Sequence, residues 1–468
     1  MPRSNERSPR ARCARLAMAA LLAGCAAAPA PETTRPNILL IYADDLGWND
    51  LGCYGNTNHR TPAIDALSAA GARFTDAYAA AAVCAPSRAS LMTGRDVLAH
   101  GIYCINDPEQ GHPEARRLDS PANQRRLPRE LPTLAEALQG AGYRTGCYGK
   151  WHLGHDGDQV SEWHPLSRGF EEAVQTRSPS GKKRYFYPTF STIPEVPIED
   201  GVHMSDFVSD QAKAFLDRDD GRPWLLYLPY FSVHGPREAK PESLRAAKAR
   251  GLKGREAVYA AMCADLDAAV GAVLSHLEAR GLADDTVVIF ASDNGGTTAS
   301  DNAPLRAGKG WLYEGGVRTP LLVRWPGVTS PGATFEQPVT QLDLFPTLCR
   351  AGGARDAPEL DGVDLAPLLA GDELAPRALR FHAPDYGRFR RGAFERTPTS
   401  ALRQGSIKLV YDHETQRAAL YDLSRDVSES EDLSGAQPAQ TDALEVALRR
   451  WLDENTSLRP RRRPAVVR

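Results

Sequence analysis

Several short apolar segments stand out along the chain, and each ends in polar residues. The first covers residues 37–43 and is followed by two aspartates. Others lie at residues 224–228, 286–291 and 320–325. A short uninterrupted apolar run of this kind is typical of a strand that is buried on both faces. The pattern therefore predicts the inner strands of a parallel sheet.

Segments with helical periodicity alternate with these strands. The longest covers about residues 256–280 and is closed by Gly281, and another runs from Thr61-Pro62 to about residue 70, with Thr61 as its cap. This alternation predicts an α/β fold with a large, doubly wound, mostly parallel sheet flanked by helices. We also expect strands near residues 73–78 and 143–148 and helices near residues 134–138 and 207–216.

Charged and amide side chains follow the predicted strands where the strands end. Such residues usually serve turns or helix caps when they occur singly. Ligands of doubly wound sheets, however, bind beyond the ends of the strands. The recurrence of polar residues at several strand ends therefore predicts one active site. It would contain Asp44, Asp45, Lys150, His152, His234, Asp293 and Asn294.

The acidic and amide members of this group have the chemistry of a metal site. Asp44, Asp45, Asp293 and Asn294 offer oxygen ligands from two strand ends. Oxygen ligands suit a hard cation such as calcium or magnesium better than zinc. Lys150 and His152 are two residues apart, so in an extended segment they would point to the same side.

Residues 84–88, Cys-Ala-Pro-Ser-Arg, precede another predicted helix. A helix that begins near Pro86 would place Cys84 at its electropositive end and Arg88 one turn further on, in a position that favours anions. Taken alone, a cysteine before a helix is usually a small buried residue, and Pro-Ser is an ordinary helix start.

The complete pattern, Cys-x-Pro-Ser-Arg followed by Leu-x-Thr-Gly-Arg at residues 91–95, resembles the signature of the type I sulfatases of the alkaline phosphatase-like superfamily. The stretch around Lys309 resembles that family's second signature, with Ala307 where many members have glycine. The resemblance implies that a maturation enzyme converts Cys84 to formylglycine. It also implies that Asp44, Asp45, Asp293, Asn294 and the modified Cys84 bind calcium, with magnesium the less favoured ion.

The resemblance further implies a mechanism for sulfate ester hydrolysis. The hydrated aldehyde at position 84, activated by calcium and Arg88, would attack sulfur. Lys150 and Lys309 would stabilise charge on the sulfate oxygens. His234 would protonate the leaving oxygen, and His152 would accept the proton of the remaining hydroxyl so that sulfate departs.

Two other functions remain open from the sequence. Similar formylglycine sites accept phosphoryl groups, so a phosphonate monoester or phosphodiester hydrolase is one alternative. A non-catalytic binder of sulfated glycans is the other, if Cys84 stays a thiol. The chain has neither His-Glu-x-x-His nor Gly-x-Ser-x-Gly, which argues against metalloproteases and common esterases.

Composition and the first residues indicate where the protein acts. A net charge of -3, from 56 basic and 59 acidic residues, gives no support to nucleic-acid binding. The apolar run at residues 16–23 is too short to span a membrane but suits a signal peptide. Residues 22–25 resemble a bacterial lipobox, which predicts an exported lipoprotein anchored through a lipid on Cys25, in the periplasm or at the outer-membrane surface. The alternative is a secretory signal cleaved at a nearby alanine.

Export favours a carbohydrate sulfate ester as substrate.

The rest of the sequence predicts how the chain is divided into domains. After the catalytic α/β domain, two apolar strands at residues 407–411 and 418–423 predict a hairpin, followed by a helix at 442–453. The basic end of the chain is expected to lack regular structure. The spacing of the eight cysteines assigns no disulfide. The expected parts are a signal peptide (1–25), a flexible tether (26–35), the catalytic domain (36–350), a C-terminal α+β subdomain with an antiparallel sheet (351–458) and a basic tail (459–468).

Overall fold

The computed structural model describes residues 35–105, 112–154, 160–177, 185–354 and 360–463. The expected signal peptide, including Cys25, and all but the last residue of the expected tether lie outside these residues. Residues 35–468 cluster as one compact unit.

A nine-stranded sheet forms the centre of this unit, with the strand order β11-β2-β10-β9-β1-β8-β5-β6-β7. Its central strand, β1 (Asn37–Ala43), pairs in parallel with β8 (Trp224–Pro229) and with β9 (Thr286–Ser292). The parallel pairing continues through β5 (Arg144–Gly149) to β6 (Glu172–Arg177). The predicted α/β class with a mostly parallel sheet is confirmed.

The two edges of the sheet depart from parallel pairing. On one edge β10 (Leu321–Arg324) is antiparallel to β9 and to β2 (Ala72–Phe74), and on the other β7 (Ser191–Ile193) is antiparallel to β6. The single strand expected at residues 73–78 is wrong. Its second half forms β3 (Ala77–Tyr78), which leaves the sheet to pair with β12 (Val339–Thr340), while β2 pairs with β11 (Ala333–Phe335).

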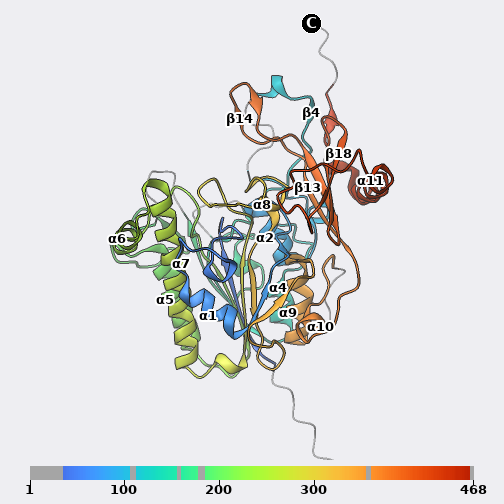
Figure 1. The fold of residues 1–468 in the computed structure, drawn as a ribbon. Coiled ribbons are helices and arrows are strands. Elements are labelled where there is room, and N and C mark those ends of the chain that lie inside the picture. The colour runs from blue at the N-terminus through green and yellow to red at the C-terminus, as the bar shows by residue number, and fades with distance from the viewer. Residues whose placement is uncertain (1–34, 106–111, 155–159, 178–184, 355–359, 464–468) are drawn as a thin grey trace, which may run out of the picture. The chain divides into compact units, whose positions relative to one another are not determined.

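Helices cover both faces of the sheet (Figure 1). The alternation of side chains along β1 explains this, because Leu39 and Ile41 belong to one buried apolar cluster while Leu40 and Tyr42 belong to the other. The first cluster includes α1 (Pro62–Ala70), α5 (Met204–Leu216) and α7 (Gly254–Ala279); the second includes α2 (Cys84–Thr93), α4 (Leu134–Gly140) and α9 (Leu344–Gly352). Shorter helices are α3 (Val97–His100), α6 (Pro241–Ala249), α8 (Glu314–Val317) and α10 (Ala366–Leu369).

Among the described residues, α7 is the one helix long and apolar enough to cross a membrane, by length and composition alone. Two thirds of its most apolar window is buried inside the protein. Side chains such as Leu266 and Val270 belong to the apolar cluster on one face of the sheet. The helix is therefore accounted for as a core helix.

The C-terminal part carries a second, antiparallel sheet of four strands: β13 (Ala378–Ala383), β16 (Thr399–Gln404), β17 (Ile407–Asp412) and β18 (Arg417–Asp422). β17 and β18 form the expected hairpin. Helix α11 (Pro438–Leu452) lies beside this sheet (Figure 1). The short hairpin β14 (Phe389–Arg390) and β15 (Ala393–Phe394) follows β13.

The basic end of the chain is partly ordered, contrary to expectation. Residues Arg461–Arg462 form β19, which pairs with β4 (Leu118–Asp119). The Arg463 guanidinium also donates to the Asp119 carboxylate. Only a run of basic residues is visible locally, and the acidic partner lies more than 300 residues away, so no local signal could show this pairing.

Candidate active site

The ends of the three strands β1, β9 and β5 bring the predicted polar residues together. Asp44 and Asp45 follow β1, and Asp293 follows the neighbouring β9. The backbone N–H of Asp45 donates to the Asp293 carboxylate at 3.1 Å. Asp44 and Asp293 are completely buried, and Asp45 is nearly so. Burial of three neighbouring carboxylates requires compensating cations.

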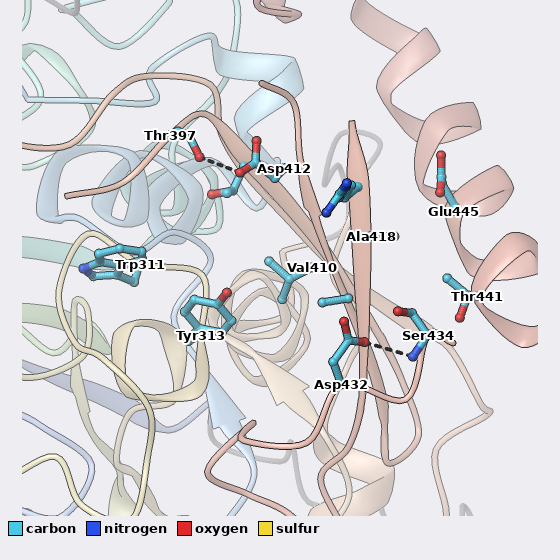
Figure 2. A pocket seen from close by; sticks show the side chains of 13 residues that line it. Trp311, Tyr313, Thr397, Val410, Asp412, Ala418, Asp432, Ser434, Thr441 and Glu445 are labelled. Atoms are coloured by element: carbon cyan, nitrogen blue, oxygen red, sulfur yellow. Dashed lines mark hydrogen bonds between the residues drawn. The ribbon is translucent and has the colours of Figure 1, made fainter. Parts of the chain in front are cut away.

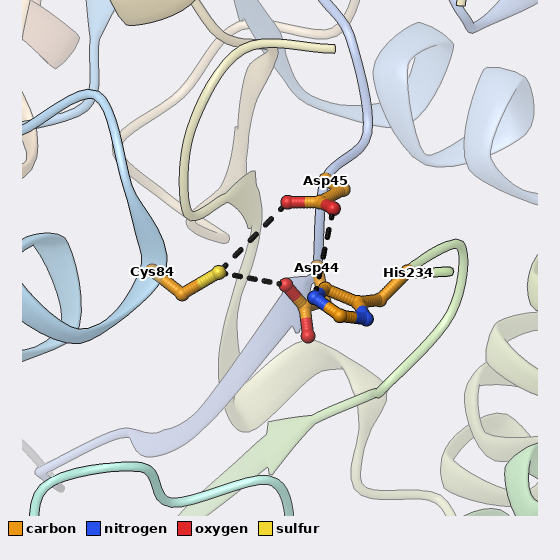
Figure 3. Close-up of side chains that lie close together, drawn as sticks. All are labelled: Asp44, Asp45, Cys84 and His234. Carbon is orange, nitrogen blue, oxygen red and sulfur yellow. Dashed lines mark hydrogen bonds and ion pairs between the residues drawn. The ribbon is translucent and has the colours of Figure 1, made fainter. Parts of the chain in front are cut away.

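Cys84 is the first residue of α2, so the expected helix start near Pro86 is two residues too late. Pro86 fits inside the first turn because the first N–H groups of a helix have no partner within it. The Cys84 thiol is fully buried and lies 3.2 Å from an Asp44 oxygen and 3.8 Å from an Asp45 oxygen (Figure 3). Burial, and after it the Asp293 and Asp44 carboxylates, raises the pKa of Cys84 well above its ordinary value.

Arg88 lies one turn along α2, also fully buried. Its Nε and Nη2 atoms donate to one oxygen of Asp293 at 3.0 and 2.7 Å, and Nη1 donates to the Lys150 carbonyl at 2.9 Å. The guanidinium also lies 5.2 Å from the centre of the Tyr42 ring. Arg88 therefore links α2 to the ends of β9 and β5, and its guanidinium donates to Asp293 and Lys150 rather than to the Cys84 side chain.

Two lysines neutralise the aspartates that follow β1. The Lys150 ammonium donates to Asp44. The Lys309 ammonium lies 2.5 Å from Asp45 and 3.0 Å from the Cys84 sulfur. Burial raises the pKa of Asp45, but the charges of Lys309, His234 and Lys150 outweigh it and hold that pKa well below its usual range.

The two histidines reach the same region by different routes. His234 lies in the turn after β8, with Nε2 3.9 Å from an Asp45 oxygen (Figure 3). Burial, and next the charge of Lys150, lowers the pKa of His234 to about 3. His152 does not lie in an extended segment as expected, because β5 ends at Gly149 and His152 has φ of 65°. Burial, followed by the Lys150 charge, lowers the pKa of His152 well below its usual value.

The residues present fit a divalent metal ion. Asp44, Asp45, Cys84 and His234 each offer a ligand atom, and these atoms all lie within 4.8 Å of one another. In addition, the buried side-chain oxygen of Asn294 accepts no hydrogen bond from the described residues, while its amide nitrogen donates to Asp45 at 3.0 Å. A buried oxygen without a donor is the arrangement that a cation would satisfy.

Asp293 differs from the other expected metal ligands because both of its oxygens already accept hydrogen bonds from the protein. One of its oxygens accepts the two bonds from Arg88, and the other accepts the Asp45 N–H. His234, by contrast, adjoins the acidic cluster, although the sequence indicated it only as a proton donor. The sequence could not separate these roles, because both residues simply follow a strand.

The charges of the site balance before any ion is bound. Asp44, Asp45 and Asp293 face Arg88, Lys150 and Lys309. A divalent cation among these groups would therefore leave a net positive charge near Cys84. Such a charge attracts an anionic group to that position.

A buried ionic cluster adjoins the Lys309 loop (residues 305–313), and the sequence did not show which residues pair in it. The Lys408 ammonium, completely buried on β17, lies 2.8 Å from Glu314 and 2.9 Å from Glu429. The backbone N–H of Glu314 also donates to Glu429 at 2.6 Å. A lysine in the middle of an apolar strand was the available signal, but the two glutamates that it pairs with are distant in the sequence.

Comparisons with known proteins bear on this geometry. A family model described as Sulfatase matches residues 36–354, and one described as N-sulphoglucosamine sulphohydrolase, C-terminal, matches residues 307–457. Arylsulfatase A of Homo sapiens is 34% identical, over 88% of this chain and 86% of its own length. N-acetylgalactosamine-6-sulfatase of Canis lupus familiaris is 32% identical, over 79% of this chain and 72% of its own length.

A solved structure shares the fold over most of the chain. The crystal structure of Ps i-CgsB in complex with k-i-k-neocarrahexaose matches with a TM-score of 0.76 and 29% identity. The match covers 90% of this chain and 94% of that chain. The likeness therefore includes both the central sheet and the C-terminal sheet.

Proposed function

The chain belongs to the sulfatase family of hydrolases that act on sulfate esters, and from this premise we propose that it removes sulfate from carbohydrate sulfate esters with a formylglycine formed from Cys84 and a calcium ion. One observation carries the proposal. The Cys84 side chain lies between an aspartate carboxylate at 3.2 Å and the Lys309 ammonium at 3.0 Å. A nucleophilic oxygen at that position would have both a base and a cation beside it.

The surroundings of Cys84 argue against chemistry by the thiol itself. Reactive cysteines lie in electropositive, partly exposed places where the thiolate is stabilised. Cys84 is fully buried against the Asp44 carboxylate. Conversion to formylglycine would replace the sulfur by a hydrated aldehyde, which supplies the attacking oxygen without a thiolate.

Asp44, Asp45, Asp293, Asn294 and the modified residue 84 would hold the calcium ion, with His234 beside them. When bound, the ion supplies charge stabilisation to sulfate oxygens and lowers the pKa of a coordinated hydroxyl. Arg88 keeps Asp293 and the end of β5 in place through its three hydrogen bonds. Lys150 and Lys309 bring positive charge to the two sides of residue 84.

The histidines supply the proton transfers of this proposal. His234 has a side chain that is 25% exposed, so a substrate oxygen can approach it from the solvent side. We assign to it the protonation of the leaving alcohol oxygen, because the negative charge of a bound sulfate beside it would raise its pKa from about 3. His152 is assigned the acceptance of a proton at residue 84 when sulfate leaves. General acid–base groups of this kind contribute about 10²–10⁴-fold in rate.

The relatives support a carbohydrate substrate. One is named for the 6-sulfate of N-acetylgalactosamine, and the structural neighbour was solved with a neocarrahexaose. A cleft of about 600 Å³ beside Lys309 offers more room than a sulfate group needs. We test this by measuring sulfate release from a panel of sulfated mono- and oligosaccharides and from aryl and steroid sulfates. Cleavage of the aryl or steroid sulfates alone would refute the carbohydrate proposal.

The metal proposal has its own test. Removal of divalent ions with a chelator should abolish sulfate release, and calcium should restore it better than magnesium, because an oxygen-rich site of this kind suits a larger, flexibly coordinated ion. Full activity of the metal-free protein, confirmed by elemental analysis, would contradict the proposal.

The phosphonate alternative is less favoured, because arylsulfatase A and N-acetylgalactosamine-6-sulfatase are both more than 30% identical to this chain. Comparison of kcat/KM for an aryl sulfate with that for an aryl phosphonate monoester would separate the two activities.

We further propose export and anchoring through a lipid on Cys25. Replacement of Cys25 by serine should then move the protein from the membrane fraction to the soluble fraction, and unchanged membrane association would contradict this.

A further inference from the structure

The cleft beside Lys309 extends well beyond the reacting groups. Its volume of about 600 Å³ lies within the range of about 300–1,000 Å³ that is typical of pockets for drug-sized ligands. The Lys309 loop, with Trp311, lines one side, and the segment after β13, with Tyr386 and Arg388, lines another. The cleft can therefore hold a sugar unit next to the one that carries the sulfate to be removed.

The lining of this cleft has an excess of positive charge. Its two acidic residues are both neutralised: Asp385 lies 3.0 Å from Arg396, and Glu395 lies 3.3 Å from Arg390, outside the lining. The basic residues that line the cleft are Lys309, Arg116, Arg388 and Arg396.

Arg388 is the basic residue of this lining that is best placed to receive a ligand. It is exposed, and its guanidinium forms no hydrogen bond or ion pair with the residues that the structure describes. Its backbone is fixed at the base of the β14–β15 hairpin, because the Glu395 N–H donates to the Arg388 carbonyl at 2.8 Å. A planar guanidinium on a fixed backbone can bind a sulfate or carboxylate group through two parallel hydrogen bonds.

A second hollow, which shares Trp311 with the cleft, has a different charge. Trp311 also lines a second hollow of about 570 Å³ on the C-terminal sheet (Figure 2). This hollow contains one basic residue, Arg417, and three acidic ones. Of the acidic residues, Glu445 lies 2.7 Å from Arg449, which leaves Asp412 and Asp432. The lining of this hollow therefore has no excess of positive charge, and a second anionic group is better accommodated beside Arg388.

Building on the proposed function, we infer that Arg388 forms a second anion subsite, and that the preferred substrate carries a sulfate or carboxylate on the sugar adjoining the scissile sulfate ester. Arg116 borders the same place, with its guanidinium 5.7 Å from the ring centres of Tyr386 and Phe394. The subsite selects the substrate and takes no part in the reaction at residue 84.

The test measures binding separately from turnover. In the Cys84→Ala background, dissociation constants are measured by calorimetry for two matched pairs of sugars. The first pair is the chondroitin 6-sulfate disaccharide and the same disaccharide with its uronate carboxylate reduced to an alcohol. The second pair is neocarrabiose with one sulfate and with two.

We expect the second anion to tighten binding in at least one pair, and Arg388→Gln to reduce that preference about tenfold. Arg391→Gln is the matched control, because Arg391 is an exposed arginine of the same hairpin that does not line the cleft. It should keep the preference. The preference should also shrink at high salt, because Arg388 is exposed.

Three results would overturn the inference: no tighter binding of either dianionic sugar, an unchanged preference in Arg388→Gln, or an equal loss in Arg391→Gln. Turnover by the unsubstituted enzyme is followed in parallel as sulfate release. If Arg388→Gln loses the preference but the unsubstituted enzyme releases no sulfate, the proposed function is contradicted and the subsite stands. If sulfate is released but one of the three results above is found, the subsite fails and the proposed function stands.

Discussion

At the scale of single residues, the site depends on contacts between groups from different strand ends. Sequence analysis found Asp44, Asp45 and Lys150 because they follow predicted strands, and Lys309 through the resemblance to a family signature. The structure brings all four together beside Cys84. It could not show that Arg88 would bond Asp293, because hydrogen-bond partners depend on side-chain positions that only the packed fold sets.

Lys309 gives the first prediction at this scale. Its ammonium lies 3.0 Å from the Cys84 sulfur, where charge on a bound sulfate would be stabilised. Lys309→Ala should reduce kcat/KM by about 10²–10³-fold, as expected for the loss of one preorganised electrostatic group. Steady-state sulfate release checks this. Lys248→Ala, at an exposed lysine of α6, should retain activity. A decrease below threefold in Lys309→Ala would contradict the role.

His234 gives a prediction that depends on the substrate. If it protonates the leaving oxygen, its removal harms substrates whose alcohol is a poor leaving group. His234→Ala should therefore slow hydrolysis of a sugar sulfate by about 10²–10⁴-fold and that of a nitrophenyl sulfate far less. Equal losses of kcat on both substrates would show that His234 acts in another way, for instance through the metal site that it adjoins.

At the scale of elements, the strand ends position the site and the C-terminal sheet supports it. The buried strands and long helices were predictable, because their apolar patterns are continuous. The side chain of Thr61, expected to cap α1, makes no capping hydrogen bond. Elements with short or mixed apolar patterns were not predictable. The segment at residues 72–78, for example, divides between two sheets because β2 and β3 pair with different strands. Such pairing is a property of distant residues, and no window of sequence contains it.

The Lys408 cluster allows a test at this scale. Lys408→Met would leave Glu314 and Glu429 buried without a cation between them. Loss of one partner of a buried ion pair costs about 3–5 kcal/mol, so we expect a decrease of that size in the free energy of unfolding, measured with urea. Adding Glu314→Gln to this variant should restore part of the loss. Unchanged stability in Lys408→Met would show that the cluster does not support the Lys309 loop.

At the scale of the whole molecule, loops of the catalytic part and the segment at the end of β13 together line the cleft beside Lys309. The family resemblance predicted an α/β domain with a C-terminal antiparallel sheet, but it did not predict which charged residues line the cleft. Arg388 and Trp311 lie more than 70 residues apart in the sequence, and neither belongs to a motif that marks it as a lining residue. Their proximity follows from the packing of the two sheets.

Buried histidines make the stability of the whole molecule sensitive to acid. Burial lowers the pKa of His382 to about 4, from about 6.5 in an unfolded chain. Between these values the unfolded chain binds the extra proton, so stability is complete above about pH 6.5 and falls as the pH decreases toward 4. His382→Gln should make the decrease shallower by about 1.4 kcal/mol per pH unit near pH 5, measured by urea unfolding across pH. An unchanged slope would contradict this origin.

The central claim is that Cys84 is converted to formylglycine, the group from which the attacking oxygen derives. Mass spectrometry of the peptide containing residue 84, from protein made in its native host, tests this most directly. We predict the mass of an aldehyde at residue 84 in active protein, and loss of activity in Cys84→Ala with an unchanged fold. An unmodified thiol in protein that hydrolyses sulfate esters would contradict the account.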